Sequence, residues 1–242
     1  MDLFDDLPLL TDGALTQIAP GAVLLHGFVR EADADLLQAT RSVVAQAPLR
    51  HWQTPGGYTM SVAMSNCGAL GWVSDPNGYR YAALDPVSKL PWPAMPAMPA
   101  CLLDLAQRAA AQAGYPHFQP DACLINEYVP GAKLSLHQDK DENDLRAPIV
   151  SLSMGLPAVF LFGTPSRKDR PQRYRLVHGD VVVWGGPSRL AYHGVAALVS
   201  GATRLTWRGG AARRSCCRRG RADTPDTACL TRLRASRVGL RR

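Results

Sequence analysis

The chain has 242 residues, of which 46% are hydrophobic, and it carries a formal net charge of +7. No apolar run approaches the roughly 18–20 residues of a membrane-spanning helix, and the acidic start at Met1 to Asp6 is unlike the basic region of a signal peptide. Six cysteines without a Cys-x-x-Cys pair argue against a zinc site or a disulfide framework. These properties predict a soluble cytoplasmic protein with reduced thiols.

The positive charge is confined to the C-terminal end of the sequence. Residues 1–200 contain 15 Lys and Arg against 18 Asp and Glu, whereas residues 201–242 contain 12 Arg against 2 Asp. A basic chain usually indicates a nucleic-acid partner. Here the charge of the predicted folded part is slightly negative, so the pI says nothing about the partner of that part.

The first elements alternate between strands and one helix. Residues 1–19 show no clear period and are interpreted as a loose leader before the main domain, which is expected over residues 20–200. An apolar strand is predicted at residues 21–28 and a helix at residues 31–47. The turn signal Pro-Gly-Gly within residues 50–66, followed by alternating apolar residues, predicts a hairpin.

Residues 68–99 form a long segment rich in Pro and Gly that also contains Trp72, Tyr79, Tyr81 and Trp92. A loop of this length in a compact domain is usually functional or disordered. The aromatic residues favour a lid or binding surface, and with the preceding hairpin the lid would cover about residues 50–99. The alternative is that these rings only cover the edge of the core.

The second half of the chain is predicted to be mostly β-structure. A helix over residues 101–113 ends at Gly114, a helix-terminating signal. Seven short strands follow with polar turns and no helix between them: 122–128, 133–139, 149–154, 158–162, 173–177, 180–184 and 189–195. This order predicts a mainly β protein with flanking helices, in which antiparallel strands form a jelly roll.

The strand around Leu134 to Asp139 carries a candidate metal site. His137 and Asp139 are two residues apart, so an extended backbone projects both to one side. Together with His193 they would form the two-His, one-carboxylate set that suits non-haem Fe(II) and leaves positions open. A lone His-x-Asp also occurs by chance in solvated turns. His178 and Asp180 are interpreted as turn residues and not as ligands.

Several motifs in the same order resemble the AlkB-type alkylated-nucleic-acid dioxygenases over about residues 20–195. The matching stretches are Gly56 to Ser61, Gly71-Trp72, Leu124 to Tyr128, Pro130 to Asp141, Gly179 to Gly186, and Tyr192 to Gly194. The resemblance implies a double-stranded β-helix, which is a jelly-roll variant, with Fe(II), 2-oxoglutarate and O₂ as its reactants. It also implies oxidative demethylation of N-alkylated bases such as 1-methyladenine and 3-methylcytosine, with release of formaldehyde, succinate and CO₂.

The resemblance also assigns roles to individual residues. It implies that His137, Asp139 and His193 bind the iron, and that Asn126 and Tyr128 donate hydrogen bonds to 2-oxoglutarate. The implied base- and phosphate-binding residues are Trp72, Tyr79, Tyr81, Asp141 and Arg167. The expected substrate is alkylated DNA, single-stranded or with its base flipped out, with RNA as a second substrate. The expected state is a monomer without a membrane partner.

The chain departs from the family pattern after His193. Family members end in a strand with the pattern Arg-x-Asn-x-Thr-x-Arg, whose arginines hold 2-oxoglutarate, and by spacing the first of these would fall near Gly210. Residues 201–242 lack that pattern and are predicted to be an irregular basic tail that replaces the final strand. A frameshifted reading of the gene and a DNA-binding arm are the two explanations.

Two other classes of protein share parts of the pattern. A cupin-like metal protein would have the sheet and the His-x-Asp pair but would not need the aromatic lid. A non-catalytic nucleic-acid binder would use the lid and tail without iron. Iron content and turnover of 2-oxoglutarate to succinate distinguish these alternatives from a dioxygenase.

Overall fold

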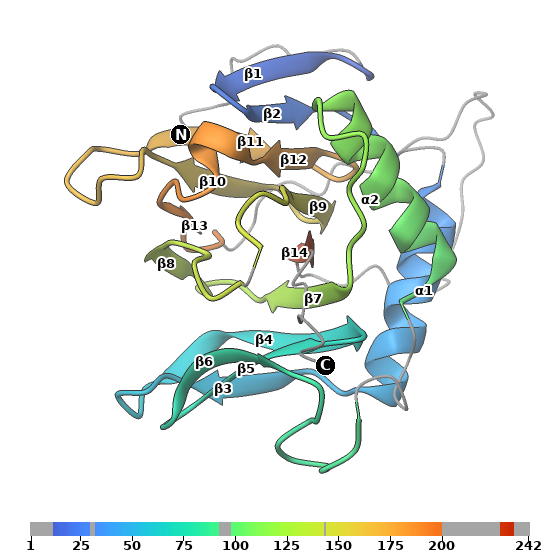
Figure 1. The fold of residues 1–242 in the computed structure, drawn as a ribbon, viewed down its shortest axis with the longest axis vertical. Coiled ribbons are helices and arrows are strands. Elements are labelled where there is room, and N and C mark those ends of the chain that lie inside the picture. The colour runs from blue at the N-terminus through green and yellow to red at the C-terminus, as the bar shows by residue number, and fades with distance from the viewer. Residues whose placement is uncertain (1–11, 30–31, 92–97, 143, 200–227, 235–242) are drawn as a thin grey trace, which may run out of the picture.

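The computed structural model describes residues 12–29, 32–91, 98–142, 144–199 and 228–234. These residues form two facing antiparallel sheets and a separate two-stranded sheet, with two α-helices packed against the outer face of the larger sheet (Figure 1). The predicted mainly β fold with flanking helices and a jelly-roll core is confirmed. Within this part of the chain, no helix is long and apolar enough to cross a membrane.

The larger sheet has eight strands and runs through the centre of the molecule. In spatial order they are β1 (Leu15–Ala19), β2 (Ala22–Leu25), β12 (Val181–Trp184), β9 (Ile149–Gly155), β14 (Ala228–Arg234), β7 (Ala122–Tyr128), β4 (Thr59–Gly68) and β3 (Arg50–Gln53). The smaller sheet has four strands, in the order β11 (Gln172–Leu176), β10 (Ala158–Phe162), β13 (His193–Val195) and β8 (Leu134–His137).

The central strands of the larger sheet are buried on both faces, which explains their continuous apolar sequences. In β12 all four residues are buried. Val182 and Trp184 face the core between the sheets, whereas Val181 and Val183 belong to the core under helices α1 (Asp33–Gln46) and α2 (Ala100–Gln112). Because successive side chains of a strand point to opposite faces, one apolar run supplies both cores.

The first strand corrects one expectation about the N-terminus. Residues 1–19 were expected to be a loose leader, but Leu15–Ala19 form β1, which pairs antiparallel with β2. The sequence of β1 has no apolar alternation because the strand lies at the sheet edge, where its side chains are only partly buried. Residues 1–11 lie outside the described part.

The C-terminal tail requires a second correction. Residues 228–234 were expected to be irregular, yet they form β14, which pairs antiparallel with β7 on one side and β9 on the other. The physical reason is that buried backbone N–H and C=O groups must be hydrogen-bonded, and β14 provides partners for two central strands. The rest of the predicted tail, including the position of the missing arginine pattern, lies outside the described residues.

The predicted lid is more regular than its Pro- and Gly-rich sequence indicated. It was interpreted as a long irregular segment, but β5 (Gly71–Asp75) and β6 (Gly78–Ala82) form an antiparallel hairpin. Trp72 lies directly opposite Tyr81 in its register, and Ser74 lies opposite Tyr79. Cross-strand pairing places the three aromatic residues on one face of the hairpin.

Candidate metal centre and adjoining cavity

Three potential metal ligands meet where β8 and β13 pair. His137 ends β8 and lies opposite His193 in the antiparallel register, and Asp139 follows two residues later. Nε2 of His193 lies 3.1 Å from Oδ2 of Asp139, and Nε2 of His137 lies 3.5 Å from Oδ1. The ligand atoms of all three residues lie within 4.8 Å of one another. Two residues from one strand region and one from its neighbour therefore form a single cluster.

The orientation of both imidazoles suits metal binding. Nδ1 of His137 lies 2.8 Å from the carbonyl oxygen of Ser135, and Nδ1 of His193 lies 3.0 Å from that of Ala191. A carbonyl can only accept, so each Nδ1 carries the proton and each Nε2 presents its lone pair. Histidine ligands of metal ions are commonly oriented in this way. The donor set thus fits a divalent transition metal such as Fe(II).

The cluster is buried on one side and open on the other. His193 is fully buried and Asp139 is 6% exposed, whereas the side chain of His137 is 32% exposed. His137 and Asp139 face a cavity of about 570 Å³. A molecule in this cavity could therefore approach the metal position from the side of His137.

Residues from several strands and from the loops beside them line this cavity. They include Thr59 to Val62 and Met64 of β4, Trp72 and Tyr79 of the lid hairpin, Leu124 and Asn126 of β7, Leu134 to His137 of β8, and Asp141 and Arg167. The indole of Trp72 and the ring of Tyr79 stack with centroids 5.7 Å apart and planes 16° apart. The cavity thus joins the metal cluster to an aromatic wall.

The structure brings most of the expected binding residues to this cavity. Asn126, Asp141 and Arg167 line it, as do Trp72 and Tyr79. Tyr128 lies on the same face of β7 as Asn126 and is completely buried in the core between the sheets. Tyr81 is not among the lining residues. Its hydroxyl donates a 3.3 Å hydrogen bond to Oε1 of Glu142.

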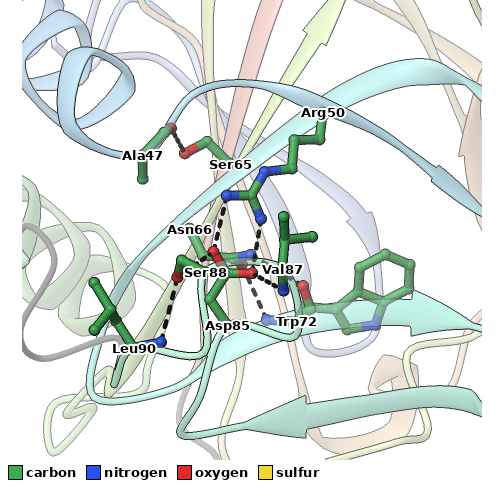
Figure 2. Close-up of polar contacts among 9 residues, drawn as sticks. All are labelled: Ala47, Arg50, Ser65, Asn66, Trp72, Asp85, Val87, Ser88 and Leu90. Carbon is green, nitrogen blue, oxygen red and sulfur yellow. Dashed lines mark hydrogen bonds and ion pairs between the residues drawn. The ribbon is translucent and has the colours of Figure 1, made fainter.

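The backbone of Trp72 is fixed by a buried amide that the sequence did not reveal. Oδ1 of Asn66 accepts a hydrogen bond from the N–H of Trp72, and Nδ2 of Asn66 donates to its carbonyl, both at 3.0 Å (Figure 2). Asn66 lies on β4 and is 1% exposed. The aromatic wall is therefore attached to the larger sheet at Trp72.

A second buried group holds the segment that follows the hairpin. The carboxylate of Asp85 accepts two hydrogen bonds from Arg50 at 2.7 and 2.8 Å, and one each from the N–H of Val87 and the hydroxyl of Ser88 (Figure 2). Burial raises the pKa of Asp85, but the hydrogen bonds from Arg50, Val87 and Ser88 outweigh it and lower the pKa from 3.8 to about 2. This carboxylate stays ionised and anchors the lid segment to β3.

The two residues interpreted as turn residues have structural partners away from the cluster. Nδ1 of His178 accepts from the N–H of Gly155, and its Nε2 lies 3.4 Å from Asp33. Asp180 accepts from the backbone N–H groups of Gly27 and Val177. Neither is part of the three-residue cluster.

The comparisons with known proteins agree on one family. The sequence model of the 2OG-Fe(II) oxygenase superfamily matches residues 21–227. The chain is 59% identical over 189 residues to the alpha-ketoglutarate-dependent dioxygenase AlkB of Escherichia coli, covering 78% of this chain and 86% of that protein. It is 43% identical over 194 residues to the AlkB homolog of Caulobacter vibrioides, covering 80% and 85% of the two chains.

More distant relatives extend the comparison to other nucleic acids and to the fold. The tRNA demethylase abh1 of Schizosaccharomyces pombe is 39% identical over 109 residues, which is 45% of this chain and 36% of that protein. The solved structure of OsALKBH1 has a TM-score of 0.70 at 24% identity and covers 91% of this chain and 99% of that chain. At this identity the structural likeness concerns the fold.

Proposed function

The chain belongs to the AlkB-type dioxygenases of the 2OG-Fe(II) oxygenase superfamily, and from that membership we propose how its residues perform their reaction. It is an Fe(II)- and 2-oxoglutarate-dependent dioxygenase that oxidatively demethylates alkylated nucleic-acid bases. The observation that carries the proposal is that His137 and Asp139 of the metal cluster line the same cavity as the stacked rings of Trp72 and Tyr79.

In this proposal Fe(II) is bound by Nε2 of His137, Nε2 of His193 and the carboxylate of Asp139. Their close approach and the backbone-fixed tautomers support the assignment. Three protein ligands leave coordination positions for 2-oxoglutarate and O₂. When bound, Fe(II) and 2-oxoglutarate supply the activation of O₂ that oxidises the N-alkyl carbon of the base. The protein orients the reactants and excludes water.

Asn126 and Tyr128 are proposed to donate hydrogen bonds to 2-oxoglutarate. Both are completely buried on one face of β7, and Asn126 reaches the cavity next to the metal cluster. An amide N–H and a phenol O–H are donors that suit the carboxylates and ketone of this co-substrate. Burial strengthens such hydrogen bonds because water does not compete for the donors.

The aromatic wall is proposed to hold the alkylated base. Trp72 and Tyr79 would stack on it, with Tyr81 beside them on the same face of the hairpin. Asp141 would accept from the exocyclic amine of the base, and Arg167 would bind its phosphate, since both line the cavity. A base inside a duplex cannot reach the metal, so the substrate must be single-stranded or have its base flipped out.

DNA is the proposed main substrate, and RNA the second. The high identity to the AlkB proteins supports demethylation of DNA, whereas the relative named as a tRNA demethylase matches less than half of this chain. Formaldehyde release from single-stranded DNA and RNA oligonucleotides of equal sequence, each carrying 1-methyladenine or 3-methylcytosine, tests this. Formaldehyde release from RNA alone would contradict DNA as the main substrate. Succinate formation without formaldehyde from any substrate would contradict the proposed demethylation activity.

The proposal also includes a monomeric protein in the cytoplasm. Within the described residues Cys67, Cys101 and Cys123 are free thiols, which fits a reducing compartment. Light scattering after gel filtration tests the monomer, because a dimer would double the mass of the 26.2 kDa chain. Cell fractionation tests the location.

A further inference from the structure

A buried arginine lies directly behind the metal cluster. Arg189 follows the short 3-10 helix at Gly186–Ser188, and its side chain is only 4% exposed. Its Nη1 donates a 2.7 Å hydrogen bond to the backbone carbonyl of the proposed ligand Asp139, and its Nε donates at 2.9 Å to the carbonyl of Ala147. One guanidinium thus holds both ends of the segment from Asp139 to Ala147.

The same guanidinium also contacts the middle of that segment. Nη2 of Arg189 lies 3.1 Å from Oε2 of Glu142, whose side chain is completely buried. Oε1 of Glu142 in turn accepts the hydrogen bond from the hydroxyl of Tyr81 on the lid hairpin. A continuous chain of polar contacts therefore leads from the lid through Glu142 and Arg189 to the backbone of Asp139.

The geometry of these contacts allows the guanidinium to link the lid hairpin to the backbone of Asp139. The position of the Asp139 carboxylate depends on its own backbone, which is fixed by a short, charge-assisted hydrogen bond. Arginine has donors in a rigid planar fork and can serve three acceptors at once, which a lysine ammonium on a flexible stem cannot do with the same geometry. Removing a donor here takes a hydrogen-bond partner from a buried acceptor.

We propose that Arg189 is a positioning residue that couples the aromatic lid to the metal-ligand carboxylate. This inference rests on the proposed function. It goes beyond that function because it assigns a role to a residue that contacts neither base nor metal. With a base against the lid, the contact from Tyr81 through Glu142 to Arg189 holds Asp139 in its ligating position. Oxidation of 2-oxoglutarate is thereby tied to the presence of the base.

The main test uses the full chain with Arg189→Lys, which keeps the charge and loses the fork. Co(II) titration, followed by its d–d absorption without 2-oxoglutarate or nucleic acid, should show metal affinity reduced about tenfold or more, as for other groups that orient metal ligands. With methylated oligonucleotide, succinate formed per formaldehyde should rise above the wild-type ratio. The matched control is Arg146→Lys in the same segment, where Arg146 is 86% exposed and pairs with Asp144; it should change neither quantity.

A second variant keeps the test informative if Arg189→Lys fails to fold. Tyr81→Phe removes a single hydroxyl and should also raise the ratio of succinate to formaldehyde. If both variants fold, their effects on the ratio should be less than multiplicative in the double variant, because they interrupt one path. A folded Arg189→Lys protein with wild-type Co(II) affinity and ratio would overturn the proposal, and so would a wild-type ratio in Tyr81→Phe.

Failure of the proposed function can be recognised separately. The Co(II) titration requires neither base nor co-substrate, so it reports on Arg189 even if the wild-type chain releases no formaldehyde. A purely structural role would lower the unfolding temperature of Arg189→Lys and leave the Co(II) affinity of the folded fraction unchanged, which also contradicts the proposal.

Discussion

The two imidazoles of the metal cluster present Nε2 to Asp139 because each Nδ1 faces a backbone carbonyl, at 2.8 Å for His137 and 3.0 Å for His193. This arrangement is local, since each carbonyl belongs to the residue two positions earlier in the chain. A strand that carries a histidine at its end can therefore orient a ligand without help from distant side chains. Only the pairing of β8 with β13, which brings the two histidines together, depends on residues that are distant in sequence.

The first prediction concerns these ligands. His137→Ala and Asp139→Ala should each abolish Fe(II)-dependent formaldehyde release, because two remaining ligands do not hold the ion in an open site. Metal content after reconstitution and dialysis measures the cause directly. The control is His178→Ala, which should retain iron because His178 contacts Gly155 and Asp33 instead. Loss of iron in that variant with retention in His193→Ala would refute the assignment.

The second prediction concerns the aromatic wall. Trp72→Ala should weaken binding of methylated oligonucleotide by about 1–3 kcal/mol, because base–aromatic stacking is lost. Turnover of 2-oxoglutarate without nucleic acid should change little, since Trp72 lies on the lid hairpin and not on the metal strands. Fluorescence anisotropy and succinate assays measure the two quantities. Equal losses in both would identify Trp72 as a core residue.

The third prediction concerns the pH dependence of stability. The pKa of Asp85 is lowered to about 2 in the folded chain, so its stabilising contribution is complete above its ordinary value of 3.8 and is lost as the pH falls through about 2. The shift corresponds to about 2 kcal/mol of unfolding free energy. Urea unfolding between pH 5 and pH 2 should therefore show a smaller acid loss in Asp85→Asn than in the wild type. Asp104→Asn, which removes the exposed pair with Arg108, is the control and should follow the wild type.

At the scale of elements, the lid hairpin combines an aromatic face that lines the cavity with a hydrogen-bonded attachment to the larger sheet. Its first strand is hydrogen-bonded to buried Asn66, and the segment after its second strand is fixed by Asp85 (Figure 2). Stacking on a preorganised ring costs less conformational entropy than stacking on a mobile one. Asn66 and Asp85 thus hold the aromatic wall in place without being part of it.

The fourth prediction concerns β14. A chain that ends after residue 227 should unfold at lower urea concentration than one that ends after residue 234, because it leaves β7 and β9 without their shared partner. The comparison isolates the seven residues of the strand. Equal unfolding midpoints would show that β14 contributes nothing to stability.

At the scale of the whole molecule, charge and chemistry are unevenly distributed along the chain. Residues 201–242 carry 12 Arg against 2 Asp, whereas the rest of the chain is slightly acidic. The described part of this tail enters the larger sheet at a position where Leu230 lies opposite Asn126, the proposed 2-oxoglutarate contact. The tail therefore reaches the strand that bears the co-substrate site.

The fifth prediction follows from the missing arginine pattern. Without it, 2-oxoglutarate should bind more weakly by about 2–5 kcal/mol, roughly 30- to several-thousand-fold, while Fe(II) still binds. An anaerobic titration that follows the visible absorption of the Fe(II)–2-oxoglutarate complex measures this. Restoration of tight binding by grafting an Arg-x-Asn-x-Thr-x-Arg strand after Val195 would support the frameshift explanation.

Tight binding of 2-oxoglutarate by the unmodified chain would point to a different arginine. Saturation at low micromolar 2-oxoglutarate in the unmodified chain would contradict weak binding and show that another arginine of the tail takes the role. Arg213→Ala, Arg214→Ala and Arg232→Ala would then identify it. The last of these lies opposite Leu124 in the β14 register.

The sequence alone predicted the fold class, the cluster of His137, Asp139 and His193, and a set of binding residues most of which line the cavity. Its apolar runs indicated strands that the structure confirms within a few residues, such as Ala122–Tyr128 and Ala158–Phe162. The period of two in a strand is a local property, so it places His137 and Asp139 on one side before any tertiary contact is known. The family motifs, which match in order over most of the chain, identified the rest.

Only the tertiary structure decided the contacts between residues that are distant in sequence and have no local pattern. Asn66 holding Trp72, Asp85 holding Arg50, and Arg189 joining Asp139 to Glu142 depend on polar side chains whose partners the chain order does not indicate. The same reason explains β14, because its place between β7 and β9 is set by the backbone hydrogen bonds these strands require and not by an apolar period of its own.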